Sequence, residues 1–200
     1  MHDLIVFGGG GHAKVVIGTA RAAGYQPSLV IEANPSKWGQ QVMAVLIAGD
    51  GDLPTPPYNG VIAIGANHVR QKLNEHYTAC TWQTLLHPSA IIDESSQIGA
   101  GTVVFAGAVI QPEVSIGRHV VINTSATVDH DCRIGDYVHI APGTNLAGSV
   151  EVGEGTLIGI GSAVLPGVKI GSWSIIGAGA IVTASIPARS KGGGVPARVI

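Results

Sequence analysis

Aliphatic residues recur at every sixth position through the second half of this sequence. Positions two residues earlier, from Ser96 to Ala180, hold only small residues or valine. Five glycines add a second period of 18, at Gly99, Gly117, Gly135, Gly153 and Gly171. The seventeen consecutive aliphatic positions are Leu86, Ile92, Ile98, Val104, Ile110, Ile116, Ile122, Val128, Ile134, Ile140, Leu146, Val152, Ile158, Val164, Ile170, Ile176 and Val182.

Nested periods of six and 18 predict a parallel β-helix, a solenoid in which each hexapeptide forms one short strand and one corner. Three hexapeptides close a triangular coil of 18 residues, and the next coil stacks on it at the inter-strand spacing of about 4.8 Å. The aliphatic residue points inward, and the small residue turns the corner. Known hexapeptide solenoids of this type are left-handed, which the sequence pattern alone does not determine.

The first eighty residues follow a different pattern, in which strands and helices alternate. This βαβ order predicts a small parallel sheet of the half-Rossmann type. We expect an α/β domain over residues 1–84 and a β-helix domain with a C-terminal tail over residues 85–200. The expected elements are strands at 4–7, 28–31 and 61–64, one more short strand near 42–48, and helices at 13–23 and from 67 to about 76.

A glycine-rich turn joins the first strand to the first helix. The spacing Gly8-x-Gly10-x-x-Ala13, with Glu32 ending the next strand, fits a dinucleotide fingerprint, in which backbone N–H groups at a helix start bind phosphate. An NAD-dependent oxidoreductase is therefore one alternative. However, the domain supplies only half of a dinucleotide fold, and the solenoid offers no hydride site. Half of such a fold can still bind a mononucleotide, and a purely structural tight turn also remains open.

Charge, hydropathy and cysteine content exclude several classes. A net charge of −2 gives no basic surface for nucleic acid. The apolar runs are too short for a membrane span, and no signal peptide is recognisable at the start. Cys80 and Cys132 form no disulfide framework, and Cys132 stands at a small-residue corner position. We therefore expect a soluble cytoplasmic protein that keeps its thiols reduced.

His130 is the histidine whose surroundings point most directly to chemistry. Asp129 and Asp131 flank it, and a carboxylate on one imidazole nitrogen orients the ring and raises its basicity. The residues 18 apart from it are Pro112 and Gly148, so glycine lies directly above the histidine. We expect an open place there, and the Gly148 N–H offers a donor for a tetrahedral oxyanion. Pairing of His130 with Asp131 requires the chain to bend at this corner.

The other histidines give weaker signals. His119, His130 and His139 occupy different parts of the coil and none is 18 residues from another, so we expect no metal site between them. His68, His76 and His119 have no chemical neighbours in sequence and are interpreted as surface groups. His12 lies in the glycine loop, where ligand contact and a role at the helix start are both open.

The two halves together resemble the bacterial nucleotide-sugar N-acetyltransferases of the hexapeptide-repeat family. This group includes the bacillosamine and perosamine enzymes and is related to the sialic acid O-acetyltransferases. The resemblance covers essentially the whole chain and is closest to the GDP-perosamine type, although the motifs do not settle the nucleotide. It rests on VFGGGGHAKV at 6–15, AIGANHVR at 63–70, Asn123-Thr124, Asp129-His-Asp-Cys132, Leu146-Ala-Gly148 and the segment 161–170.

This resemblance implies a role for each site residue. It makes His130 the general base and Asp131 its carboxylate partner. It places His139 at the thioester region of acetyl-CoA, with Ile160 and Ala178, which are 18 residues apart, along the pantetheine path. Asn123 reaches the sugar, and the residues implied to hold the nucleotide are Gly10, Gly11, His12, Glu32, Gly65, Asn67 and Arg70.

The expected reaction is direct transfer of an acetyl group from acetyl-CoA, without a metal, to the amine of a nucleotide-linked 4-amino-4,6-dideoxy sugar. Neighbouring subunits would form the cleft, so we expect a homotrimer with a role in surface polysaccharide synthesis. One alternative is O-acetylation of a sialic acid or related sugar, whose hydroxyl would depend more steeply on the base. Another is a non-catalytic scaffold that binds nucleotide sugars, which would neither bind acetyl-CoA nor release free thiol.

Overall fold

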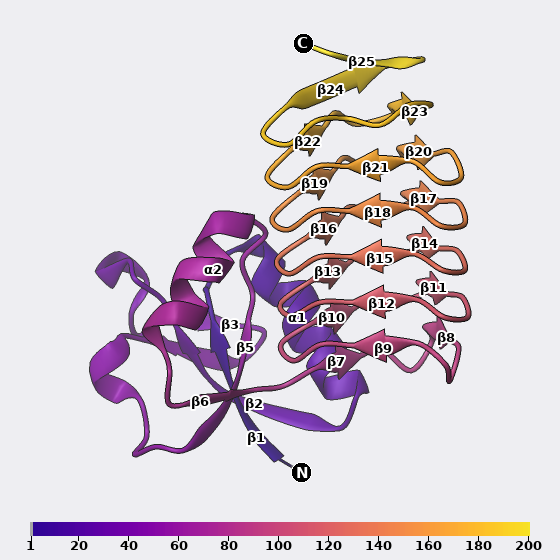
Figure 1. The fold of residues 1–200 in the computed structure, drawn as a ribbon. Helices are drawn as coiled ribbons and strands as arrows, with labels where there is room; N and C mark the ends of the chain where they lie inside the picture. The colour runs from indigo at the N-terminus through magenta and orange to yellow at the C-terminus, as the bar shows by residue number, and fades with distance from the viewer. Residues whose placement is uncertain (1) are drawn as a thin grey trace.

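The computed structural model describes residues 2–200, with side chains from residue 3 onward, as two domains that lie side by side (Figure 1). The sequence predicts an α/β domain followed by a parallel β-solenoid, and both are present. The N-terminal domain packs against the lower part of the solenoid. The last strand of the first domain is β6 (Cys80–Trp82), and the first strand of the solenoid is β7 (Leu85–Leu86).

The N-terminal sheet has six strands in the order β3-β4-β2-β1-β5-β6. All neighbours are parallel except β3 and β4, which form a hairpin. Helix α1 begins at Gly11, two residues earlier than predicted, and β2 begins at Tyr25 instead of residue 28. The elements are β1 (His2–Phe7), α1 (Gly11–Ala22), β2 (Tyr25–Ile31), η1 (Pro35–Lys37), β3 (Gln41–Val42), β4 (Val45–Ala48), η2 (Asp50–Asp52), β5 (Tyr58–Ile62), α2 (Asn67–His76) and β6.

The solenoid strands form three sheets, one on each face of a triangular coil. Sheet C has the order β25-β24-β22-β19-β16-β13-β10-β7, sheet D is β23-β20-β17-β14-β11-β8, and sheet E is β21-β18-β15-β12-β9. A C-terminal hairpin, β24 (Lys191–Gly194) and β25 (Ala197–Val199), ends sheet C. The other strands are β8 (Ile91–Ile92), β9 (Gln97–Ile98), β10 (Val103–Val104), β11 (Val109–Ile110), β12 (Ser115–Ile116), β13 (Val121–Ile122), β14 (Thr127–Val128), β15 (Arg133–Ile134), β16 (His139–Ile140), β17 (Asn145–Leu146), β18 (Glu151–Val152), β19 (Leu157–Ile158), β20 (Ala163–Val164), β21 (Lys169–Ile170), β22 (Ile175–Ile176) and β23 (Ile181–Val182).

Residues 18 apart are paired throughout the solenoid, as in Val104 with Ile122 and Ile122 with Ile140. The sixth-position aliphatics and the small residues two positions earlier form one buried core. Leu86, on the first coil, is an exception at 39% exposed, because no coil covers it from below. Cys132 is buried as a free thiol and donates to the Ala147 carbonyl, so its role here is structural.

The two domains meet through the outward positions of sheet C. Leu85, Val103 and Val121 stack on one another and are buried together with the apolar face of α1. In the next coil the same column continues with His139 on β16. The column therefore changes from apolar to polar where α1 begins, and the first polar position lies at the domain junction.

Candidate active site

His130 and Asp131 form a hydrogen-bonded pair on the corner between β14 and β15. The His130 Nδ1 atom lies 2.7 Å from Asp131 Oδ2, and His130 N–H donates to Asp129 Oδ1 at 2.8 Å. Asp131 has a φ of +60°, and this left-handed turn is the bend that brings adjacent side chains together. Both side chains are more than half exposed.

The hydrogen bond to Asp131, followed by the charge of Asp129, raises the pKa of His130 above its ordinary value. With Nδ1–H directed at a carboxylate, the Nε2 atom of the neutral ring is an acceptor. An exposed imidazole of raised basicity with a free acceptor nitrogen is suited to take a proton from a substrate.

Gly148 lies directly above the His130 ring, but the space over it is not open. A Cβ atom at residue 148 would lie 2.6 Å from both Cε1 and Nε2 of His130, so the ring itself occupies that space. The expectation of an empty place is therefore wrong in this structure, because the imidazole folds onto the glycine. Among the described residues, none accepts a hydrogen bond from the Gly148 N–H.

The glycine loop leaves the start of α1 open. Gly10 caps the helix without a side-chain hydrogen bond, and a Cβ atom at Gly10 or Gly11 would meet nothing within 4 Å. Both glycines are exposed. Helix N-termini carry free N–H groups and a partial positive charge, so this place can accept a phosphate.

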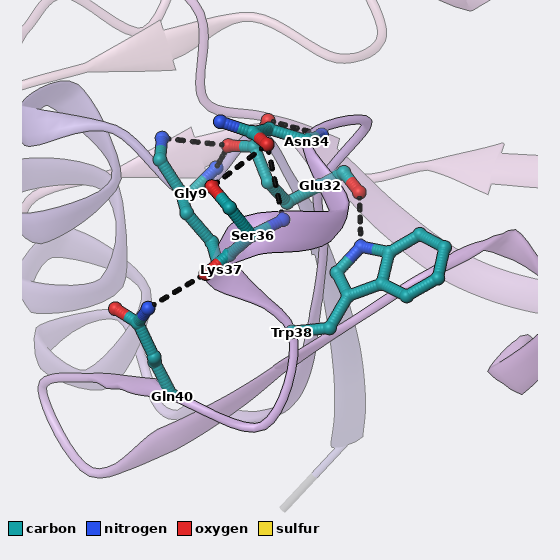
Figure 2. A network of polar contacts seen from close by, with 7 residues as sticks. All are labelled: Gly9, Glu32, Asn34, Ser36, Lys37, Trp38 and Gln40. Atoms are coloured by element: carbon teal, nitrogen blue, oxygen red, sulfur yellow. Dashed lines mark hydrogen bonds and ion pairs between the residues drawn. The ribbon is translucent and has the colours of Figure 1, made fainter.

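Glu32 is committed to the loop around it (Figure 2). Its Oε2 atom accepts from the Gly9 N–H at 3.0 Å and from Lys37 Nζ at 3.2 Å, and its Oε1 atom accepts from the Asn34 N–H at 3.1 Å. Burial alone would raise the pKa of Glu32, but these hydrogen bonds outweigh it and lower the pKa. In this structure the carboxylate therefore shapes the glycine loop.

His139 and Asn123 meet at the domain junction. The His139 Nδ1 atom lies 3.3 Å from the Gly65 carbonyl oxygen, which can only accept, so Nδ1 carries the proton. The Nε2 atom then accepts from Asn123 Nδ2 at 3.1 Å, while Asn123 Oδ1 accepts from the Thr124 N–H. Both nitrogens of His139 thus have protein partners.

His12 lies beside this pair and extends the junction toward the glycine loop. Its ring centroid is 6.2 Å from that of His139 and 5.5 Å from that of Phe105, against which it packs edge to face. The buried His12 Nε2 atom has no hydrogen-bond partner among the described residues. Sequence reasoning missed Phe105, since a single phenylalanine in the solenoid gives no local signal.

Arg70 and Asn67 tie the domains together rather than face the loop. Arg70 is 1% exposed, and its five N–H groups donate to five backbone carbonyls. Asn67 Nδ2 donates to the Gly155 carbonyl at 2.9 Å. All the donors of Arg70 therefore serve the interface instead of the ligand contact that the resemblance implies, whereas the buried Oδ1 atom of Asn67 has no partner among the described residues. The five acceptors of Arg70 are the carbonyls of Ile64, Gly65, His119, Tyr137 and Val138.

His119 is buried, so its interpretation as a surface group is wrong, whereas His68 and His76 are exposed. Its ring stacks on Tyr137, with centroids 5.6 Å apart, and α2 covers this corner. Burial, and then the charge of Arg70, lowers the pKa of His12, His119 and His139 to about 4. These three histidines are neutral at pH 7.

Ile160 and Ala178 stack on the corner between sheets C and D. The Gly179 N–H donates to the Ile160 carbonyl at 2.8 Å, which fixes the two coils in register. Ile160 is 60% exposed although it is apolar. Thr124, next to Asn123, begins this same corner column, so an apolar strip leads along the solenoid from Asn123.

The sequence-predicted residues fall into two groups on opposite sides of the solenoid. The first, which we call the junction group, comprises Gly10, Gly11, His12, Gly65, Asn123 and His139 and lies against sheet C. The second, the corner dyad, is His130 with Asp131, between strands of sheets D and E. Because a triangular coil has its D–E corner opposite face C, one chain does not bring the two groups together (Figure 1).

The described part of the chain holds neither a metal-binding cluster nor a membrane-spanning helix. Among residues 2–200, no cluster of three or more His, Cys, Asp or Glu side chains is arranged to hold a metal ion. No helix within these residues has both the length and the apolar character needed to cross a bilayer.

Comparisons with family models match both halves of the chain. Residues 3–77 match the PglD N-terminal domain, and residues 113–148 and 149–184 match the bacterial transferase hexapeptide repeats. No curated protein sequence matches the chain.

Solved structures that are similar to the chain cover all of it. PerB from Caulobacter crescentus, in complex with CoA and GDP-perosamine, is 37% identical, with a TM-score of 0.91 over 100% of this chain and 98% of that one. The acetyltransferase domain of PglB from Neisseria gonorrhoeae FA1090 is 33% identical, with a TM-score of 0.93 over 100% of both chains. The same domain in complex with acetyl coenzyme A is 34% identical, with a TM-score of 0.92 over 100% and 99%.

Proposed function

Because the chain belongs to the family of hexapeptide-repeat sugar N-acetyltransferases with a PglD-type N-terminal domain, we propose that its acceptor is a nucleoside diphosphate-linked 4-amino-4,6-dideoxy sugar. The chain is an acetyl-CoA-dependent N-acetyltransferase of a nucleotide amino sugar. GDP-perosamine, the ligand of the Caulobacter enzyme, is the first acceptor to test.

The observation that carries the chemistry is the 2.7 Å contact between His130 Nδ1 and Asp131 Oδ2. Acetyl-CoA supplies the acetyl group as a thioester. The sugar amine attacks the carbonyl carbon, a C–N bond forms, the C–S bond breaks, and CoA leaves as a thiolate. His130 Nε2 takes the proton from the amine nitrogen, and the imidazolium, stabilised by Asp131, returns it to the thiolate.

The tetrahedral intermediate carries a negative oxygen that needs a hydrogen-bond donor. The Gly148 N–H supports this role because it has no acceptor among the described residues and lies next to the His130 ring. The exposed strip at Ile160 and Ala178 fits the pantetheine arm, whose contacts are largely apolar.

The junction group provides the nucleotide-sugar end of the site. The open start of α1 at Gly10 and Gly11 suits the diphosphate, and Asn123 retains a second Nδ2–H beyond the one that it gives to His139. This free donor faces the place where a sugar hydroxyl would bind.

A complete active site requires two subunits, which supports a homotrimer. The corner dyad and the junction group lie on opposite sides of one solenoid, so a base from one subunit must serve the nucleotide sugar held by the next. Cyclic threefold symmetry repeats this contact at three equivalent sites. Two buried free thiols are in keeping with a reducing, cytoplasmic location.

The test is a thiol-release assay in which acetyl-CoA is combined with UDP-, GDP- and dTDP-linked 4-amino-4,6-dideoxy sugars. We expect stoichiometric release of CoA with at least one of them, and a product mass increased by one acetyl group. The matched 4-hydroxy sugars are the control, and we expect no release with them. Thiol release with none of the amino sugars would refute the proposal, and release with hydroxy sugars alone would indicate an O-acetyltransferase.

A further inference from the structure

Trp38 is fixed in position although 48% of it is exposed. Its indole Nε1–H donates to the Glu32 carbonyl at 2.8 Å. The ring also lies against Gly49, where a Cβ atom would be 2.5 Å from Cζ2 of the indole. Packing inside the domain thus uses only part of this large side chain. A rigid, half-exposed aromatic ring is a pre-organised contact surface for a ligand.

The ring lies at the edge of the sheet where ligands bind in α/β folds. Trp38 follows η1, just after the end of β2, and Gly49 follows the end of the adjacent parallel strand β4. The glycine loop follows β1 at the same edge. Parallel sheets of this class bind ligands outside the carboxyl ends of their strands.

Glu32 separates a polar side from an aromatic side of this edge (Figure 2). The Gly9 N–H and the Lys37 ammonium group meet its carboxylate on one side, while Trp38 meets its backbone carbonyl on the other. The open start of α1 beyond Gly9 suits phosphate, and the indole suits an uncharged planar group. Glu32 lies between these two sides, so a ribose joining the phosphate to the base would lie beside it.

We propose that Trp38 is a stacking surface for the base of the nucleotide sugar, with the diphosphate at the glycine loop. This assignment rests on the proposed function, because it needs a nucleotide in the N-terminal domain. Aromatic stacking tolerates every base, since each has a π-face. Trp38 therefore contributes affinity for the nucleoside, while discrimination among bases comes from polar groups around their edges.

The test compares Trp38→Ala, Trp38→Phe and, as the matched control, Leu46→Ala, another exposed apolar residue, which lies on β4 and is 45% exposed. Binding of GDP, UDP and inorganic pyrophosphate is measured by calorimetry, and KM is measured for both substrates. We expect Trp38→Ala to weaken nucleoside diphosphate binding roughly tenfold. Trp38→Phe should retain most of the affinity, and Leu46→Ala should match the wild type.

Pyrophosphate separates loss of stacking from distortion of the loop. If Trp38 acts by stacking, pyrophosphate binding and the KM for acetyl-CoA stay at wild-type values in Trp38→Ala. Equal loss of pyrophosphate and nucleotide binding, or unchanged nucleotide binding in Trp38→Ala, would overturn the assignment while leaving the acetyltransferase activity in place. A wild-type protein that binds no nucleoside diphosphate and releases no thiol would instead refute the proposed function.

Discussion

The pKa values of four histidines shift in opposite directions in this protein because their surroundings differ. His12, His119 and His139 are held neutral by burial and by the Arg70 cation. His130 is exposed and paired with a carboxylate, which raises its pKa. The proposed acetyl transfer needs an accessible base, and of these four histidines only His130 is exposed and paired with a carboxylate.

At this residue scale, we predict that His130→Ala lowers kcat by roughly 100-fold or more if proton removal limits the rate. KM for both substrates should change little, since the base acts mainly in the transition state. The wild-type kcat/KM should rise with pH through the raised pKa of His130. In His130→Ala it should rise only as the substrate amine deprotonates, measured from pH 6 to 9.

Asp131→Asn tests the partner of the proposed base and is compared with His130→Ala. Loss of the partner charge removes what favours imidazolium, so the pH midpoint should shift downward and the loss of rate should be smaller than in His130→Ala. Wild-type turnover by His130→Ala across the whole pH range would remove His130 from the mechanism.

The elements, in contrast to single residues, could largely be predicted from the sequence. The hexapeptide period predicts the inward core of the solenoid, because inward pointing repeats with the strand and needs no distant contact. The path of the β2–η1 loop could not be predicted, since it depends on the Glu32 hydrogen bonds to Gly9 and Lys37. The face of the solenoid that packs against the N-terminal domain could have been predicted but was missed. Its outward column begins with three apolar residues, Leu85, Val103 and Val121.

Tertiary contacts explain the residues whose roles changed. Arg70 lies near the start of the predicted helix from residue 67, where a basic side chain could contact a bound ligand. Only the assembled domains place five carbonyls around its guanidinium. His119 is polar and isolated in sequence, but α2 and Tyr137 bury it.

At the element scale, we predict that the corner above His130 tolerates no side chain at residue 148. In Gly148→Val the new Cβ would meet the His130 ring at 2.6 Å, so the imidazole must leave its position beside Asp131. Activity should fall at least as far as in His130→Ala, while circular dichroism stays unchanged because the ring lies outside the core. Gly161→Val is unsuitable as a control because its φ is +66°.

Gly18→Ala supplies that control, because a Cβ there meets nothing within 4 Å and the residue lies on α1, away from the corner. It should keep full activity. Wild-type turnover by Gly148→Val would show that the ring position seen here is not the one used in catalysis.

The folding stability of the whole molecule depends on pH through the three neutral histidines at and near the domain junction. Their pKa of about 4 lies below the ordinary histidine value of 6.5, so the unfolded chain binds more protons between these limits. Folding stability is therefore complete above about pH 6.5 and falls as the pH is lowered toward 4. Each histidine can contribute up to about 1.4 kcal/mol per pH unit within this window.

Urea unfolding followed at pH 7.5, 6.0 and 5.0 measures this loss. In His119→Phe, which keeps the stacking on Tyr137, the free energy of unfolding should depend less steeply on pH than in the wild type. His76→Phe, at an exposed position, should keep the wild-type slope. Equal slopes in all three proteins would contradict the contribution of His119.

At this scale the last prediction concerns the division of the active site between subunits. His130→Ala removes the base, and Gly10→Asp places a carboxylate where the diphosphate would bind without crowding the fold, since a Cβ at Gly10 meets nothing within 4 Å. Each variant alone should be nearly inactive. When both are co-expressed at equal levels, about one quarter of the sites pair an intact base with an intact glycine loop.

Co-expression should therefore restore about a quarter of wild-type turnover per site, measured by thiol release on the unfractionated mixture of all trimers. The double variant His130→Ala, Gly10→Asp co-expressed with the wild type is the comparison, and it gives the same random fraction of intact sites. If one chain carried a complete site, mixing the two single variants would restore nothing, whereas the comparison mixture would keep half of the activity. Both mixtures contain the same two substitutions in the same amounts. They differ only in whether the substitutions lie on different chains or on the same chain, so they distinguish a shared site from a self-contained one.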